Sequence, residues 1–184
     1  MPYALIAVGA IALIVLWGIG AYNGLVSERN KVDEAFAGMD VFLKKRYDLI
    51  PNLVETVKGY AKHEKETLEA VISARSRAMS SSTPEEKMEA ESNLSGALGR
   101  LMVLTEAYPD LKANANFMDM QDSLKVMEGE IASVRTRYNS VVKVYNTKVE
   151  SVPTNIIAGL FKFEKRPMFE VSNQVERENV KVQF

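Results

Sequence analysis

The chain begins with an unbroken apolar stretch. No charged side chain occurs between Tyr3 and Tyr22, and the first one along the chain is Glu28. About 20 residues rising ~1.5 Å each span roughly 30 Å, which is the thickness of the hydrocarbon core of a bilayer. Tyr3 and Tyr22 lie at the edges of the stretch, where amphipathic rings favour the headgroup region. The pattern predicts a transmembrane helix within residues 1–24.

A cleaved signal peptide is the alternative interpretation of this stretch. Ile19-Gly20-Ala21 resembles a weak cleavage site. Signal peptides, however, begin with basic residues and have a shorter apolar core, whereas only Met1 and Pro2 precede the apolar run here. A retained single span therefore explains the segment better.

Basic residues follow the span and do not precede it. By the positive-inside rule, this asymmetry predicts a single-pass protein of the cell membrane, with its body in the cytoplasm and its N-terminus outside. The residues that carry the asymmetry are Arg29, Lys31, Lys44, Lys45 and Arg46.

After the span, apolar residues recur at the three- and four-residue spacing of amphipathic helices. A first stripe covers residues 32–50 and a second covers residues 53–72. Between them, Pro51 predicts a tight turn or a kink, with Asp48 available to cap a new helix, because proline lacks a backbone N–H and disfavours helical geometry at the preceding residue. A third helix is predicted to begin at Thr83-Pro84, where Glu86 completes a T-x-x-E capping box.

The fourth helical stretch has the most regular pattern. Its apolar positions alternate spacings of three and four, as in a heptad seam: Phe117, Met120, Leu124, Met127, Ile131, Val134, Tyr138, Val141 and Tyr145. Such a seam needs partners along its length. The other stretches of the chain can supply them in an antiparallel bundle, and a parallel coiled-coil dimer is the alternative.

Together these patterns predict an all-α protein in three parts. Residues 1–24 form the transmembrane anchor, and residues 25–152 form an elongated antiparallel helical bundle. Residues 153–184 form a C-terminal segment and a partly mobile tail. An apolar patch within residues 156–163 is expected to pack across the end of the bundle or to lie against the membrane.

Composition excludes several classes of function. The 23 basic and 24 acidic side chains nearly cancel, which argues against a nucleic-acid partner, and the absence of cysteine excludes disulfides and thiol chemistry. His63 is the only histidine, and it belongs to no zinc or di-iron motif. We therefore expect no enzyme activity, no catalytic residue, no cofactor and no metal.

Four polar residues around Pro51 form a first candidate interaction patch: Arg46, Tyr47, Asp48 and Asn52. In the structural interpretation, Asp48 caps a helix and Arg46 pairs with a carboxylate across the turn. In the functional interpretation, the four residues form a recognition patch at one end of the bundle.

A second candidate patch comes from two Tyr-Asn pairs seven residues apart, Tyr138-Asn139 and Tyr145-Asn146. The tyrosines fall on the seam and the asparagines beside it. Structurally, the rings are buried and the asparagines set helix register. Functionally, the pairs form a polar strip for a partner helix.

Several blocks of the sequence resemble the LemA family. The most specific is Arg46-Tyr47-Asp48-Leu49-Ile50-Pro51-Asn52-Leu53, and others are Tyr108-Pro109-Asp110-Leu111 and Arg135-Thr136-Arg137-Tyr138-Asn139. The resemblance implies a prokaryotic membrane protein with one N-terminal span, a helical-bundle body and no assigned enzyme activity. Some members are linked to the formation of bacterial membrane compartments.

These observations favour a membrane-anchored, non-catalytic scaffold that presents a rigid bundle to other membrane-associated proteins. The alternative is a self-assembling protein that shapes or stabilises the membrane. The expected partners are the lipid bilayer, membrane-associated proteins still to be identified and, in the alternative, further copies of the chain.

Overall fold

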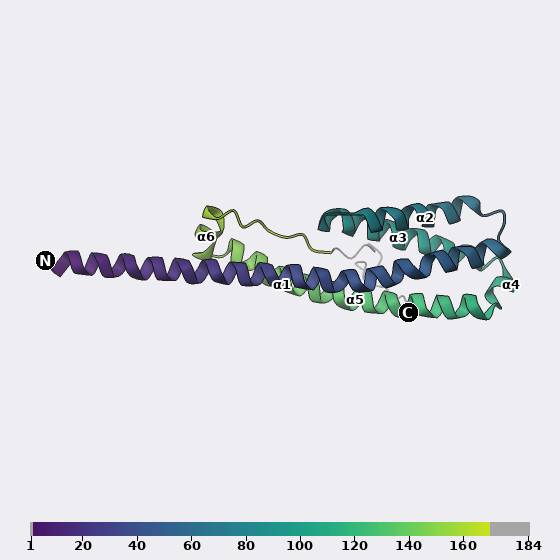
Figure 1. Ribbon diagram of the computed structural model, residues 1–184, viewed down its shortest axis with the longest axis horizontal. Helices are drawn as coiled ribbons and strands as arrows, with labels where there is room; N and C mark the ends of the chain where they lie inside the picture. Colours follow the sequence, from purple (N-terminus) through teal and green to yellow (C-terminus); the bar gives the residue numbers. More distant parts are fainter. Residues whose placement is uncertain (1, 170–184) are drawn as a thin grey trace, which may run out of the picture. The chain divides into compact units, whose positions relative to one another are not determined.

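A computed structural model describes residues 2–169, and helices make up most of this part of the chain (Figure 1). No strand occurs among these residues. The prediction of an all-α protein whose N-terminal apolar helix is followed by further helices is confirmed. In chain order the helices are α1 (Pro2–Tyr60), α2 (Lys65–Ser80), α3 (Pro84–Thr105), α4 (Pro109–Lys112), α5 (Ala115–Glu150) and α6 (Thr154–Leu160).

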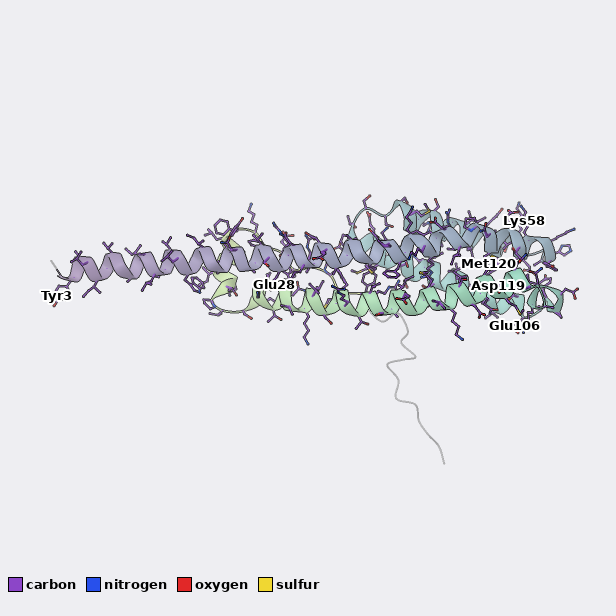
Figure 2. All side chains as sticks on the ribbon, turned by 60° about the horizontal axis from the view of Figure 1, so that its bottom comes forward. Tyr3, Glu28, Lys58, Glu106, Asp119 and Met120 are labelled. Carbon is purple, nitrogen blue, oxygen red and sulfur yellow. The ribbon has the colours of Figure 1, made fainter. Side chains whose placement is uncertain are left out.

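The apolar stretch forms the first part of α1, a helix of 59 residues that continues through Asn23 and Gly24 into the charged body. It is long enough and apolar enough to cross a membrane, and none of its most apolar window is buried. Figure 2 shows side chains radiating from α1 between Tyr3 and Glu28. Exposed apolar surface of this extent is unfavourable in water and is accommodated by lipid.

Of the two outcomes predicted at Pro51, the tight turn is wrong, because α1 continues through this residue to Tyr60, and the kink stays a prediction. Asp48 is exposed on the helix and begins no new one. Pro51 has no N–H to donate to the carbonyl of Tyr47, four residues earlier. Arg75 of α2 takes over this role, since its Nε donates to the Tyr47 carbonyl oxygen at 2.7 Å. A donor from another helix therefore satisfies the acceptor that proline leaves open.

This arrangement predicts that the effects of substituting Pro51 and Arg75 are coupled. Arg75→Met alone removes the donor and is expected to lower the free energy of unfolding by about 1–2 kcal/mol. In a Pro51→Ala background, residue 51 supplies its own N–H, so Arg75→Met should cost clearly less. Urea unfolding of the full-length protein in micelles, followed by circular dichroism, measures both costs. Equal costs in the two backgrounds would contradict the assignment.

The described residues divide into two compact units, and α1 and α5 contribute to both. One unit contains Asp40–Ser133. Within it, α2 and α3 lie side by side as an antiparallel pair (Figure 1). The predicted start of α3 is confirmed, because Thr83 and Glu86 form a capping box with Pro84 at the first turn. The core of this unit includes Leu43, Ile50, Leu53, Val57, Val71, Leu94, Leu101, Leu111 and Phe117.

The other unit contains residues up to Met39 together with Val134–Met168. In it, the first part of α1 packs against the last part of α5, as the rings of Phe36 and Tyr138 show, with centroids 5.8 Å apart. Its core includes Leu25, Val32, Met39, Tyr138, Val142 and Tyr145. The predicted division of the chain after residues 24 and 152 stays a prediction, and the tail predicted to be mobile, from Val171 onward, lies outside the described residues.

The fourth predicted stretch is a single helix, α5, whose start is capped by Asn114: the Asn114 side chain accepts the Phe117 N–H at 3.0 Å. The predicted seam contains two classes of position. Every seventh residue is buried, and the positions between these are half-buried. The buried ones are Phe117, Leu124, Ile131, Tyr138 and Tyr145. The core therefore depends mainly on one heptad position of α5.

Candidate interaction site

The first candidate patch centres on a buried ion pair. Arg46 of α1 and Glu91 of α3 are 1% and 0% exposed. The guanidinium Nη1 of Arg46 donates to Glu91 Oε2 at 3.3 Å. The hydroxyl of Tyr47 donates to the other carboxylate oxygen at 2.5 Å. Both oxygens of Glu91 are thus occupied by donors from α1, 44 and 45 residues away in sequence.

Two further residues surround the Arg46 guanidinium. Its Nη2 donates to Ser95 Oγ at 2.9 Å and lies 3.3 Å from the carboxylate of Glu128 on α5. Its Nε is buried and has no hydrogen-bond partner in the described part of the chain. Arg46 therefore joins α1, α3 and α5 through one planar group, which suits the several fixed donors of a guanidinium.

Lys87 and Tyr47 complete the cluster. The Lys87 ammonium donates to the Ala78 carbonyl at 3.2 Å, lies 3.6 Å from Asp40 and sits over the Tyr47 ring. Burial, with the hydrogen bond to Glu91, raises the pKa of the Tyr47 hydroxyl. Tyr47 therefore remains a protonated donor at neutral pH and is not a nucleophile or base. The cluster therefore holds helices together.

The structure corrects the interpretation of the four residues around Pro51. Arg46 does pair with carboxylates, but these lie on α3 and α5 and not across a turn. Arg46 and Tyr47 are buried, whereas Asp48 and Asn52 are exposed. Only two of the four side chains are therefore accessible at the surface.

Sequence reasoning missed Glu91, the residue at the centre of this cluster. Glu91 lies on the apolar stripe of α3, three residues before Leu94 and seven before Leu98, and all three are buried. A charged residue on a mostly apolar helical stripe was the signal available. Arg75, which contacts the backbone of Tyr47, carried no comparable signal.

A groove lies directly beside the Arg46 cluster, between α3 and α5. It has a volume of about 370 Å³. Leu98, Met102 and Leu124 supply apolar lining, and polar side chains from both helices and from α1 surround them. The complete lining is Arg46, Ser95, Leu98, Gly99, Met102, Gln121, Leu124, Lys125 and Glu128. We refer to this feature as the α3–α5 groove.

The second candidate patch binds a segment of the same chain. Tyr138 and Tyr145 are buried, and their hydroxyls donate to the carbonyls of Pro167 at 3.1 Å and Glu164 at 2.9 Å. Asn146 makes two hydrogen bonds with the backbone of Arg166: its amide donates at 2.8 Å and its oxygen accepts at 2.9 Å.

Asn146 therefore pairs with an extended segment and not with a neighbouring helix, contrary to the expectation that it sets helix register. Asn139, two turns earlier on α5, is half-buried. Whether either patch takes part in binding a partner stays a prediction.

Among the described residues, no group of three or more histidine, cysteine, aspartate or glutamate side chains is arranged to hold a metal ion. His63 is exposed.

A helical body continuous with an exposed apolar helix defines a membrane-associated helical protein. The LemA family matches residues 35–184, and the chain belongs to this family. The resemblance seen in the sequence motifs is therefore confirmed.

Three relatives illustrate the similarity. Protein LemA of Metamycoplasma hominis is 25% identical over 163 residues, which cover 88% of this chain and 74% of that protein. Magnetosome protein MamQ 2 of Paramagnetospirillum magneticum is 33% identical over 81 residues, covering 44% of this chain and 30% of the relative. Magnetosome protein MamQ of Magnetospirillum gryphiswaldense is 25% identical over 174 residues, covering 80% of this chain and 64% of the relative.

The chain thus spans less than two thirds of each of these MamQ proteins. None of the three names is that of an enzyme. The family and the apolar helix are both consistent with a location at the membrane.

Proposed function

We propose that this protein is a non-catalytic, single-pass membrane scaffold whose helical body binds other membrane-associated proteins. The observation that carries the proposal is the continuity of α1. Its exposed apolar part and several core residues of the body, such as Leu43 and Leu53, belong to one helix. A tether of this kind keeps the body at the membrane and raises its effective concentration there. The basic residues after the span favour a cytoplasmic body.

The α3–α5 groove is the surface that we assign to the partner. Leu98, Met102 and Leu124 line it, while Gln121 and Lys125 add polar groups. Apart from its own stretch of helix, Gly99 has no heavy atom within 4 Å of the position that a Cβ would occupy, so the backbone of α3 is accessible there. Apolar lining with polar groups around it suits an amphipathic helix laid into a groove. The proposed partner is therefore a helix of a membrane-associated protein.

Photo-crosslinking in cells tests this assignment. A photoreactive amino acid replaces Gln121, which is exposed and lines the groove, in the full-length protein. The matched control carries it at Ser123, exposed on the same helix and outside the groove lining. Positions 121 and 123 are two residues apart, so their side chains point in directions that differ by about 200° around the helix axis. The two probes therefore sample different directions. Conjugates are identified by mass spectrometry after irradiation.

The scaffold proposal expects one or a few membrane-associated proteins to be conjugated at position 121 and not at position 123. Conjugation equal at both positions would reject the groove as the binding surface. Conjugates of the protein with itself alone would replace the scaffold with self-assembly. The absence of any conjugate at either position would reject both.

Self-assembly on the membrane is the second candidate function. It is favoured by large apolar side chains that stay exposed in and beside α6, among them Ile156, Leu160 and Phe161. Such residues suit contact with lipid, as expected of copies that assemble on the membrane.

A further inference from the structure

Helix α6 packs against the end of the apolar stretch of α1 (Figure 1). The Cδ1 atom of Ile157 lies 3.7 Å from the position of a Cβ on Gly18. Gly18 precedes Tyr22, the last aromatic residue of the stretch, by about 6 Å of helix rise. The ring of Tyr22 meets those of Phe161 and Phe163 edge-on, with centroids 4.8 Å and 5.6 Å away. The helix and its flanking residues therefore lie at the level where the predicted span ends.

The large exposed side chains of α6 are apolar. Ile156 and Leu160, four residues apart on one helical face, are 64% and 72% exposed, and Phe161 is 54% exposed despite its contact with Tyr22. Ala158, by contrast, is only 2% exposed. One side of this short segment is thus buried against its own unit, and the other presents large apolar side chains outward.

The end of α6 fixes this arrangement. Phe163 donates its N–H to the Ala158 carbonyl at 2.9 Å, and Lys162 donates to Gly159 at 3.4 Å. Lys162 has a φ of 55°, in the left-handed region. This is a Schellman motif with lysine in the position that usually holds glycine. It turns the chain so that Phe163 returns to the ring of Tyr22.

Charged groups begin just beyond this level. Glu28, the first charged residue of the chain, accepts from the Lys148 ammonium at 2.7 Å. This contact lowers the pKa of the Glu28 carboxyl, so the group stays ionised. The guanidinium of Arg29 lies over the Phe163 ring at 5.3 Å. Aromatic rings next to basic residues are typical of the headgroup region of a bilayer.

We propose that α6 is a second membrane contact of this protein: the exposed side chains of Ile156, Leu160 and Phe161 insert into the headgroup–acyl boundary of the bilayer that α1 spans. The occupant of this surface is lipid because the surface continues directly from the apolar part of α1. Apolar residues of interfacial helices typically reach about 5–10 Å into this boundary. The residues that α6 and its flanking rings contact, Gly18 to Tyr22, cover about the last 6 Å of the predicted span, which is a similar depth. The inference rests on the membrane tether of the proposed function.

Depth-dependent fluorescence quenching tests the inference. The chain contains no cysteine, so single substitutions can be labelled with an environment-sensitive dye. The full-length protein is reconstituted into vesicles of phosphatidylcholine and phosphatidylglycerol, with or without lipids that carry a nitroxide near the glycerol end of the acyl chain. Labels are placed at Leu160→Cys on α6, at Gly9→Cys within the apolar stretch and at Ser140→Cys, exposed on α5.

We expect the nitroxide lipids to quench the label at position 160 strongly, to quench the label at position 9 detectably and to leave the label at position 140 bright. Quenching at position 9 without quenching at 160 would overturn the inference and leave the tether intact. A blue-shifted but unquenched label at 160 would likewise overturn it, because it indicates a protein partner. Failure to quench at position 9 would overturn the tether itself.

Discussion

Replacing Glu91 with leucine is expected to lower the free energy of unfolding by about 3–5 kcal/mol. The substitution leaves the Arg46 guanidinium, 1% exposed, without the carboxylate that accepts from its Nη1, and it removes the acceptor of the Tyr47 hydroxyl. Ser95 and Glu128 still contact Nη2. Since the Glu128 side chain is 55% exposed, its compensation is weak, so the loss should remain within this range. Urea unfolding of the full-length protein in micelles, followed by circular dichroism, measures it.

The matched control for this prediction removes both charges. Arg46→Met combined with Glu91→Leu leaves no unpaired buried charge, and replacing both partners with apolar residues is generally far less costly than breaking the pair. The double variant is therefore expected to be more stable than Glu91→Leu alone, although it carries one more substitution. The single variant Arg46→Met completes the comparison. If the double variant lost as much free energy of unfolding as Arg46→Met and Glu91→Leu lose in sum, the two residues would not be coupled, contrary to the observed contacts.

Replacing Ile131 with aspartate is expected to have an effect of similar or greater size. Ile131 is 1% exposed and occupies the buried heptad position of α5. The substitution forfeits about 1.5–3 kcal/mol of apolar burial and places a carboxyl group in the core without a partner, which adds several kcal/mol. Thermal unfolding should show a large fall in the midpoint of the transition, with loss of helicity from the body at temperatures where the native protein is folded.

Two variants on the same helix serve as controls. Met127→Asp should destabilise less, because Met127 is half-buried, and Ser133→Asp should change the free energy of unfolding by no more than about 0.5 kcal/mol, because Ser133 is exposed. Equal effects at positions 131 and 133 would contradict the assignment of the seam.

Features that depend on neighbouring residues were predictable from the sequence. The apolar stretch ending near Tyr22, the capping box at Thr83 and Glu86, and the seam of α5 all appear in the structure where the sequence predicts them. The physical reason is that side-chain periodicity and helix caps follow from the local geometry of the backbone, so residues three to seven positions apart are sufficient to predict them.

The tertiary structure decided which polar groups meet across the fold. Pro51 does not end α1 because Arg75, 28 residues from Tyr47, supplies the missing donor. Arg46 is buried because Glu91 reaches it from α3, and Asn146 is satisfied by the backbone of a later segment, at Arg166. By itself, the sequence determined a helical protein with one apolar helix suited to a membrane. The pairing of its buried polar groups depends on elements that are far apart in the sequence coming together, and no local sequence pattern shows which of these elements will meet.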